Sequence, residues 1–234
     1  MASSRDVSVV LVHGAWADGS SWSKIIRALA ADSIRTVAAP LPLTSFQDDV
    51  AALDQALGRV PGPVVLAGHA YAGAVIAATH SNAVKALVYI AALAPDENET
   101  VADAFYRLEP HPRAPTLAPD RHGLIYLPEA AFSTAFAQNA APEDLVVLTA
   151  VQRPISPACM TVAVARPLWK DRPAWFLVAE EDRMIIQENQ RFMAERMRAR
   201  VRSHPVDHTP MVTAPDTVLA VLREATSAVC RDQA

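Results

Sequence analysis

The chain has 234 residues, of which 51% are hydrophobic and 20% are charged, and its formal net charge is −4. This length suits one large α/β domain with one insertion and is short for two domains. Lys and Arg are scattered evenly, so there is no basic stripe for nucleic acid and no polybasic segment for a membrane surface. We therefore expect a small molecule as the partner and leave a homodimer open.

The N-terminus and the cysteines favour a cytoplasmic protein. Residues 1–6 lack the pattern of an export signal, and no apolar run approaches the roughly 18 residues of a membrane span. The two cysteines, Cys159 and Cys230, have no spacing typical of a metal or redox site. We favour two unpaired thiols in a reducing compartment over a structural disulfide.

The first part of the chain alternates strands and helices. Apolar runs at residues 7–13 and 35–39 predict two strands, and the second run is closed by the breaker Pro40-Leu41-Pro42. Ser45, three positions before Asp48, is typical of a helix start. The apolar side chains that define the two expected helices are Trp22, Ile25, Ile26 and Leu29 in the first, and Val50, Leu53 and Leu57 in the second.

Residues 64–76 predict a strand, a very tight turn and a helix. The apolar run Val64–Ala67 breaks at Gly68, and a second apolar run resumes after Gly73. This is the pattern of a nucleophile elbow, in which the central residue of G-x-S-x-G lies on a strained turn and projects into the active site. Here Ala70 occupies that central position, so the scaffold is present without the serine.

The rest of the chain predicts more strands and helices, interrupted by an insertion. A buried strand is expected at 86–91, and the alternation so far predicts a parallel, doubly wound sheet. Prolines then crowd residues 94–169, which we interpret as a cap with short helices at 100–108 and 129–137, inserted into a core formed by residues 1–93 and 170–234. The core resumes with a strand at 174–179, a helix carrying Phe192, Met193 and Met197, a short strand at 201–206 and a helix at 216–229.

Two loops after these later strands carry a carboxylate and a histidine. Asp182 follows the strand at 174–179, and His208 follows the last strand. Position 70, Asp182 and His208 therefore occur in the order nucleophile, acid, histidine, which is the order of α/β-hydrolase triads. A carboxylate bonded to one ring nitrogen of a histidine leaves the other nitrogen as a base. His208 is thus expected to be a competent base even without a hydroxyl at position 70.

Four motifs together carry a family resemblance: Leu11–Trp16, the elbow Gly68–Gly73, Glu181–Arg183 and Asp207-His208. With them the chain resembles the α/β-hydrolase superfamily, nearest to the small capped esterases of the methylesterase and hydroxynitrile lyase group and their bacterial relatives. The resemblance implies an α/β-hydrolase fold, an oxyanion hole made by the backbone N–H groups of Ala15 and Tyr71, no cofactor and no metal. Ala70 departs from the family serine, and Ala72 departs from the glycine usual at the fifth elbow position.

Several assignments have a second interpretation. His13 and His69 are expected to be structural, and Asp182 is preferred as the acid because the family motif places it there. Glu180 and Glu181 compete with Asp182 for that role, and Asp207 could be a solvated loop charge. The candidates for lining a substrate pocket are Trp16, Tyr106, Tyr126 and Trp169, with His111 and His122 also considered, although ordinary packing explains any one of them as well.

The missing nucleophile leaves three hypotheses open. Ala70 can be an inactivating replacement of serine in an ordinary esterase or lactonase, or a natural residue in an enzyme that needs only a base and an oxyanion pocket, including a lyase-type enzyme. The third hypothesis is a non-catalytic binding protein. We favour a working site that acts on a small, largely apolar ester, lactone or related carbonyl compound, with His208 as base.

Overall fold

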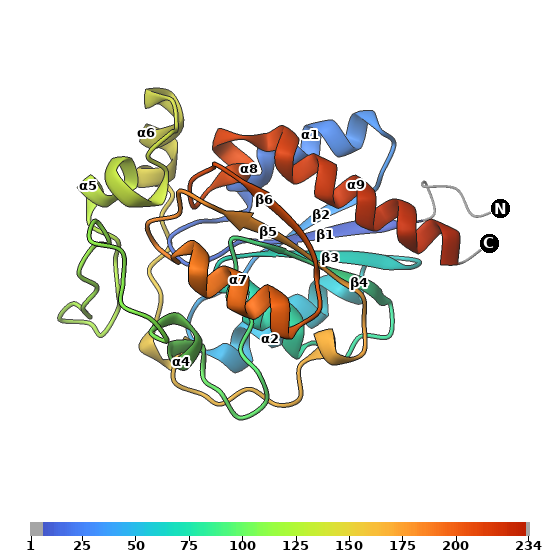
Figure 1. Ribbon diagram of the computed structural model, residues 1–234, viewed down its shortest axis with the longest axis horizontal. Helices are drawn as coiled ribbons and strands as arrows, with labels where there is room; N and C mark the ends of the chain where they lie inside the picture. The colour runs from blue at the N-terminus through green and yellow to red at the C-terminus, as the bar shows by residue number, and fades with distance from the viewer. Residues whose placement is uncertain (1–6, 233–234) are drawn as a thin grey trace.

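A parallel sheet of six strands lies at the centre of the computed structural model, which describes residues 7–232 (Figure 1). Residues 1–6, considered above for an export signal, lie outside the described part. The strand order β2-β1-β3-β4-β5-β6 confirms the expected parallel, doubly wound sheet. The strands are β1 (Ser8–Val12), β2 (Thr36–Ala39), β3 (Val64–His69), β4 (Val84–Ile90), β5 (Ala174–Ala179) and β6 (Arg200–His204).

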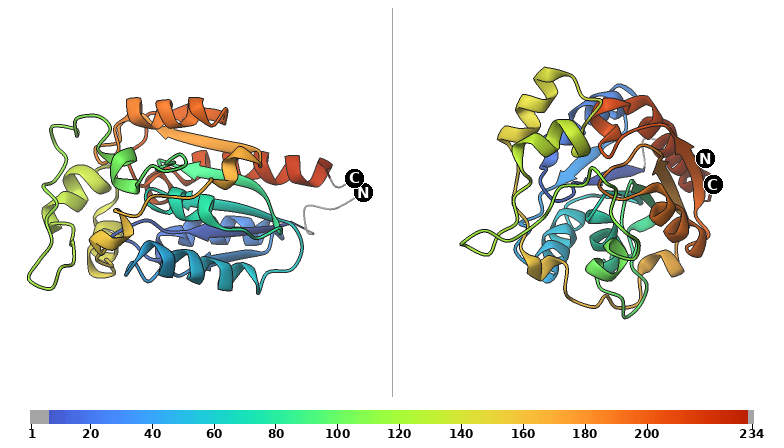
Figure 2. Two further views of the ribbon diagram at one scale, coloured as in Figure 1. Left: turned by 90° about the horizontal axis from the view of Figure 1, so that it is seen from below. Right: turned by 60° about the vertical axis from the view of Figure 1, so that its left-hand side comes forward.

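Helices cover both faces of this sheet. Helix α1 (Ser23–Ala31) packs with α9 (Pro215–Asp232) on one face, whereas α2 (Phe46–Leu57), α3 (Ala72–Ala78) and α7 (Gln187–Arg196) lie on the other (Figure 2). Strands β1, β3 and β5 are buried along their whole length, because each has neighbours on both faces. This explains why their sequences are continuous apolar runs and do not alternate.

The strand order alone predicts where on the sheet a ligand would bind. From β1 the chain runs outward to β2 and then crosses to β3 on the opposite side of β1. The loops that leave β1 and β3 therefore diverge from neighbouring strand ends, and such a switch point creates a crevice at the carboxyl edge of a parallel sheet. The Gly14–Trp16 loop and the elbow at Ala70 meet there.

The insertion, residues 94–169, adds no strand to the sheet. Figure 1 shows its helices α5 (Glu129–Ala131) and α6 (Pro142–Ala150) beyond the carboxyl ends of the strands. Its elements are α4 (Val101–Phe105), α5 (Glu129–Ala131), the π-helix η3 (Phe132–Phe136), α6 (Pro142–Ala150), and the 3-10 helices η4 (Pro157–Cys159) and η5 (Leu168–Lys170). The remaining short helices are η2 (Gly19–Trp22) and α8 (Pro210–Thr213).

The structure corrects some expected boundaries. The predicted helix at 129–137 is a single turn of α-helix that continues as a π-helix, and the predicted strand at 201–206 is β6, Arg200–His204. Helix α6 was not predicted, because it buries only Leu148 and exposes Val146 and Val147, so its apolar residues have no helical period.

Two further findings concern the cysteines and membrane spans. Cys159 is a free, buried thiol within the insertion, so the disulfide alternative is wrong. Between residues 7 and 232, no helix combines the length and the apolar character that crossing a membrane requires.

Candidate active site

The elbow between β3 and α3 holds Ala70 in the left-handed backbone conformation, with φ 50°. For an L-residue other than glycine this conformation costs roughly 1–2 kcal/mol. Main-chain bonds hold the turn: the carbonyl of Ala70 accepts from the N–H groups of Gly73 (3.1 Å) and Leu93 (2.9 Å), and its own N–H donates to Ile90 (3.2 Å). The strained position is therefore present although no serine occupies it.

Two glycines allow the close approach of strand and helix at this elbow. A Cβ at Gly73 would overlap the carbonyl oxygen of Leu93, and one at Gly68 would lie 2.8 Å from the carbonyl oxygen of Ala72. Position 72 itself is buried and accommodates a methyl group. The requirement for glycine thus falls on positions 68 and 73, which explains why Ala72 is tolerated.

Asp182 and His208 form a buried hydrogen-bonded pair at the ends of β5 and β6. Oδ2 of Asp182 lies 2.8 Å from Nδ1 of His208, and both side chains are almost completely buried. Met184 and Ile185 donate their N–H groups to Oδ1 of Asp182, and Gln190 donates to Oδ2. A carboxylate held in this way keeps the ring proton on Nδ1 and leaves Nε2 as the basic nitrogen.

The competing acids have other partners. Glu180 accepts hydrogen bonds from Arg191 and Ser203, and Glu181 accepts one from the side chain of Asn139. Among the three candidates, the structure therefore places Asp182 against His208.

The two other histidines near the elbow support the backbone. Nε2 of His13 accepts the N–H of Leu41 at 3.0 Å while its Nδ1 donates to Gly14 at 2.9 Å, and this combination requires a neutral ring. Nε2 of His69 donates to the carbonyl of His208 at 2.7 Å. Burial lowers the pKa of both rings, and for His69 the neighbouring His208 adds to the effect. Both contacts fit the expected structural roles.

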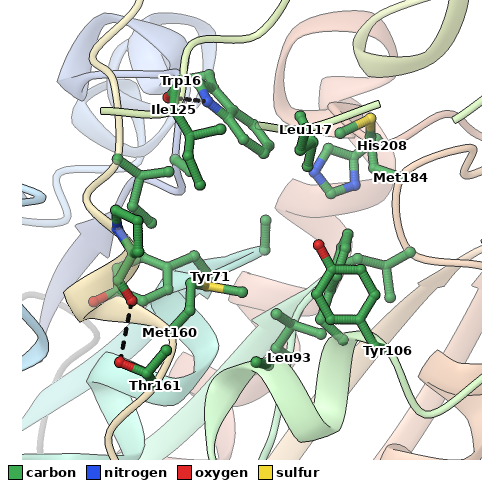
Figure 3. A pocket seen from close by; sticks show the side chains of 17 residues that line it. Trp16, Tyr71, Leu93, Tyr106, Leu117, Ile125, Met160, Thr161, Met184 and His208 are labelled. Carbon is green, nitrogen blue, oxygen red and sulfur yellow. Dashed lines mark hydrogen bonds between the residues drawn. The ribbon is translucent and has the colours of Figure 1, made fainter. Parts of the chain in front are cut away.

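A cavity of about 200 Å³ is lined by Ala70 and His208. Figure 3 shows His208 among the side chains that surround it. Within residues 7–232, the backbone N–H groups of Ala15 and Tyr71, at the edge of this cavity, donate to no acceptor of the fold. Its walls are almost entirely apolar, and most come from the insertion. They include Leu93, Ala102, Phe105, Leu117, Ile125, Ile155, Pro157, Met160, Met184 and Ile185.

The sequence matches the profile described as the alpha/beta hydrolase family over residues 9–221. The chain belongs to this family. A search among curated proteins finds no match to it.

Solved structures with the same fold include three enzymes named for small-molecule chemistry. A variant of tomato Methylketone Synthase I in complex with β-ketoheptanoate matches with a TM-score of 0.81 at 18% sequence identity and covers 95% of this chain and 98% of that chain. A variant of polyneuridine aldehyde esterase has a TM-score of 0.79 at 18% identity, covering 93% and 98%. A methylesterase from Arabidopsis has a TM-score of 0.78 at 17% identity, covering 94% and 99%. These likenesses establish the α/β-hydrolase fold.

In this α/β hydrolase, two of the four expected pocket residues line the cavity. Trp16 and Tyr106 lie on its wall. Tyr126 is 48% exposed and lies outside the cavity, and Trp169 is buried in η5, which packs against α3. His111 and His122 do not line it either. The sequence did not predict the apolar wall of the cavity. The apolar character of a residue in a proline-rich insertion indicates that the side chain is buried, but not whether it faces the cavity.

The insertion is hydrogen-bonded to the loop after β1. Trp16, whose φ is 58°, donates its backbone N–H to Arg153 and its indole Nε1–H to Ile125, each at 3.0 Å. Residues Ile125 and Ile155 are joined by an antiparallel bridge. The position of the Ala15 N–H therefore depends on the insertion.

The histidine loop, which follows β6 and carries Asp207 and His208, is hydrogen-bonded to the insertion as well. Asp207 is completely buried and accepts the N–H of Asn139 at 3.0 Å, the N–H of Thr209 at 3.2 Å and the hydroxyl of Thr213 at 2.6 Å. Its interpretation as a solvated charge is wrong, and burial raises the pKa of its carboxyl group. The ring of Phe136, on the π-helix, lies 5.3 Å from that of His208.

Within the described part of the chain, no three His, Cys, Asp or Glu side chains converge in a way that could hold a metal ion.

Proposed function

We propose that this α/β hydrolase acts on a small, largely apolar ester or lactone without forming an acyl-enzyme. His208 is the base, Asp182 orients it, and the N–H groups of Ala15 and Tyr71 hold the negative charge that develops on the carbonyl oxygen. The observation that carries the proposal is the buried pair of Asp182 and His208, which faces the cavity beside Ala70.

The chemistry needs water in place of a serine hydroxyl. Nε2 of His208 takes a proton from water as the water oxygen bonds to the carbonyl carbon, and the carbonyl electrons move to the oxygen held by the two amides. The tetrahedral intermediate then expels the alkoxide, which takes the proton from His208. The methyl group of Ala70 leaves room for the attacking water where a serine hydroxyl would otherwise lie.

The cavity wall supports a neutral substrate. None of its lining residues is Lys, Arg, Asp or Glu, and a carboxylate moved into such surroundings loses its hydration without gaining a partner. An apolar ester or lactone loses little hydration there and gains contact with the aliphatic wall.

A β-keto acid is the second candidate substrate, because its reaction also needs no nucleophile. When it loses CO₂, the electrons of the broken C–C bond form an enolate, whose oxygen the two amides can hold, and protonated His208 can return a proton to carbon. The structural neighbour bound to β-ketoheptanoate favours this candidate. Desolvation of the carboxylate in an apolar cavity would promote this step.

The test compares hydrolysis of 4-nitrophenyl butyrate by the wild type, Ala70→Ser and Ala70→Ser/His208→Gln. We expect Ala70→Ser to show a pre-steady-state burst followed by turnover, because the elbow, base and acid are already in place. The burst should vanish in the double variant, since removing one member of a triad typically costs on the order of a millionfold in rate. A wild type that shows no turnover, or a folded Ala70→Ser protein without burst or turnover, would contradict the proposal.

Two further assays separate the alternatives. Release of CO₂ from 3-oxoheptanoate by the wild type, abolished by His208→Gln, would favour the β-keto acid reaction. Tight binding of ester, lactone or keto acid with no turnover of any of them by the wild type would favour a binding protein.

A further inference from the structure

A buried carboxylate outside the proposed reaction lies beneath the elbow. Asp49, in the first turn of α2, is completely buried, and its Oδ2 accepts the hydroxyl proton of Tyr71 at 2.7 Å. The thiol of Cys159, in η4 of the insertion, lies 3.6 Å from the same oxygen. Oδ1 accepts the backbone N–H of Leu43 at 2.7 Å. No Lys or Arg in residues 7–232 forms an ion pair with Asp49.

The pKa shifts in this cluster are consistent with Tyr71 and Cys159 as hydrogen-bond donors and Asp49 as the acceptor. Burial raises the pKa of Asp49, while the hydrogen bonds from Tyr71, Leu43 and Cys159 act against that rise. Burial and the nearby carboxylate raise the pKa of Tyr71, and they raise that of Cys159 to about 12. The phenol and the thiol therefore remain protonated donors, and a hydrogen bond to a carboxylate is stronger than one between neutral groups.

We propose that Asp49 is a positioning residue, which sets the direction of the Tyr71 backbone N–H by anchoring the Tyr71 side chain. This inference rests on the proposed oxyanion role of that N–H. Asp49 touches no reacting atom and acts only through Tyr71.

The geometry of the elbow explains why an anchor is needed. A left-handed alanine persists only where the surrounding structure over-determines it. The N–H groups of Gly73 and Leu93 hold the carbonyl of Ala70, which is one end of the planar Ala70–Tyr71 peptide. Asp49 restrains the other side by holding the far end of the Tyr71 ring. The Ala70–Tyr71 peptide cannot rotate its N–H without breaking one of these bonds.

The same carboxylate connects the elbow to the cavity wall. Leu43, with φ 60°, donates its N–H to Asp49 and accepts the N–H of Ser156 at 2.9 Å. Ser156 caps η4, which carries Cys159 and is followed by the cavity residue Met160. The anchor of Tyr71 is thus shared with the part of the insertion that contacts the substrate cavity.

The first readout is independent of activity. We would record the ¹⁵N–¹H resonances of the Tyr71 and Ala15 amides in the wild type and in Asp49→Asn. The Asn side chain has only one acceptor oxygen, so it cannot accept from both the Leu43 N–H and the Tyr71 hydroxyl through separate oxygens as Asp49 does. The Tyr71 resonance should move and that of Ala15 should stay. Tyr71→Phe, which keeps the ring and removes one hydroxyl, is the milder second variant if Asp49→Asn folds poorly.

Tyr89→Phe is the matched control. Tyr89 is also completely buried, but within the described residues its hydroxyl has no hydrogen-bond partner, so the substitution removes a buried hydroxyl without releasing the elbow. In the Ala70→Ser background with 4-nitrophenyl butyrate, Tyr71→Phe and Asp49→Asn should lower kcat about tenfold and change KM by less than about twofold. Tyr89→Phe should change neither constant by more than about twofold.

The outcomes separate this inference from the proposed function. An unchanged Tyr71 resonance in Asp49→Asn and an unchanged kcat in Tyr71→Phe would overturn the positioning role, as would an equal loss of kcat in Tyr89→Phe. If Ala70→Ser is inactive while the Tyr71 amide still moves in Asp49→Asn, the proposed function fails and Asp49 still positions the amide.

Discussion

At the scale of single residues, backbone contacts hold the elbow without help from the side chain at position 70. The carbonyl of Ala70 is bonded on two sides, and Gly68 and Gly73 provide the space that lets α3 approach β3. Contacts of neighbouring residues therefore compensate for the strain of the left-handed turn. The tightest steric requirement is at Gly73.

We expect Gly73→Ala to lower the free energy of unfolding by about 3 kcal/mol, because the added methyl group overlaps the carbonyl of Leu93. Ala72→Gly is the control at the adjacent position and should cost no more than about 1 kcal/mol, the usual penalty for glycine in a helix. Urea unfolding followed by circular dichroism measures both. Equal losses in the two variants would contradict this account of the elbow.

Individual residues also differ in how well the sequence predicts their contacts. The pairing of Asp182 with His208 could be predicted because each residue follows a strand and the two occur in the chain order of α/β-hydrolase triads. The sequence did not predict the contacts of Gln190 and Asp49, because their partners Asp182 and Tyr71 are not adjacent in the chain. A polar residue in a helical pattern does not indicate which group its side chain will contact. Tyr126 was assigned to the pocket because it is aromatic, a property that says nothing of its direction.

At the scale of elements, the insertion is hydrogen-bonded to the loops that follow β1, β5 and β6. The π-helix η3 is central to this arrangement: Thr209 donates its hydroxyl to the carbonyl of Phe136, and Arg183 donates to that of Thr134. π-Helical turns occur frequently at functional sites. The sequence predicted a helix in this region but not its widened turn, because the pattern of apolar residues does not distinguish the two.

We expect Asp207→Ala to loosen the contact between the histidine loop and the insertion selectively and to lower the free energy of unfolding by about 2 kcal/mol, because the buried N–H of Thr209 and the part-buried N–H of Asn139 lose their acceptor. Hydrogen exchange should accelerate at the amides of Asn139 and Thr209 and stay unchanged at Leu66 in the central strand. Glu181→Ala, which removes an exposed acceptor of the Asn139 side chain and leaves the backbone N–H of Asn139 bonded to Asp207, is the control and should stay within about 0.5 kcal/mol of the wild type. Uniform acceleration, with Leu66 included, would mean that Asp207 supports the whole fold and not this contact.

At the scale of the whole molecule, buried neutral histidines make stability depend on pH. Burial lowers the pKa of His13 and His69 below the ordinary value of 6.5. Below about pH 6.5 the unfolded chain therefore binds protons that the folded chain does not, and stability falls as the pH decreases. Each histidine contributes a slope of up to about 1.4 kcal/mol per pH unit.

Urea midpoints between pH 7.5 and 5.5 test this dependence. The wild type should lose stability steadily below about pH 6.5, and His69→Gln should have a shallower slope. The raised pKa values of Asp49 and Asp207 act with the opposite sign, because stability falls as their carboxyl groups ionise with rising pH. The contribution of His69 is therefore read from the difference between the two proteins. The exposed His122→Gln is the control and should keep the wild-type slope; identical slopes in all three proteins would contradict the prediction.

The whole-molecule architecture was the most predictable level. Alternating apolar runs and helical patterns determine a parallel sheet, and the strand order then places the site at one edge. The path of residues 94–169 was not predictable, because their short helices are held by bonds to Leu43, Trp16 and Asp207 and not by a periodic pattern of their own.

The turn at Ala70 has a consequence for how such a protein can change over evolutionary time. Because the left-handed conformation is maintained by its surroundings, gain or loss of a hydroxyl at position 70 requires no refolding and no compensating substitution. On the proposed function, a single nucleotide change that exchanges alanine and serine codons would convert one reaction type into another on an unchanged scaffold. The fold can therefore be inherited unchanged while the residue at position 70 changes.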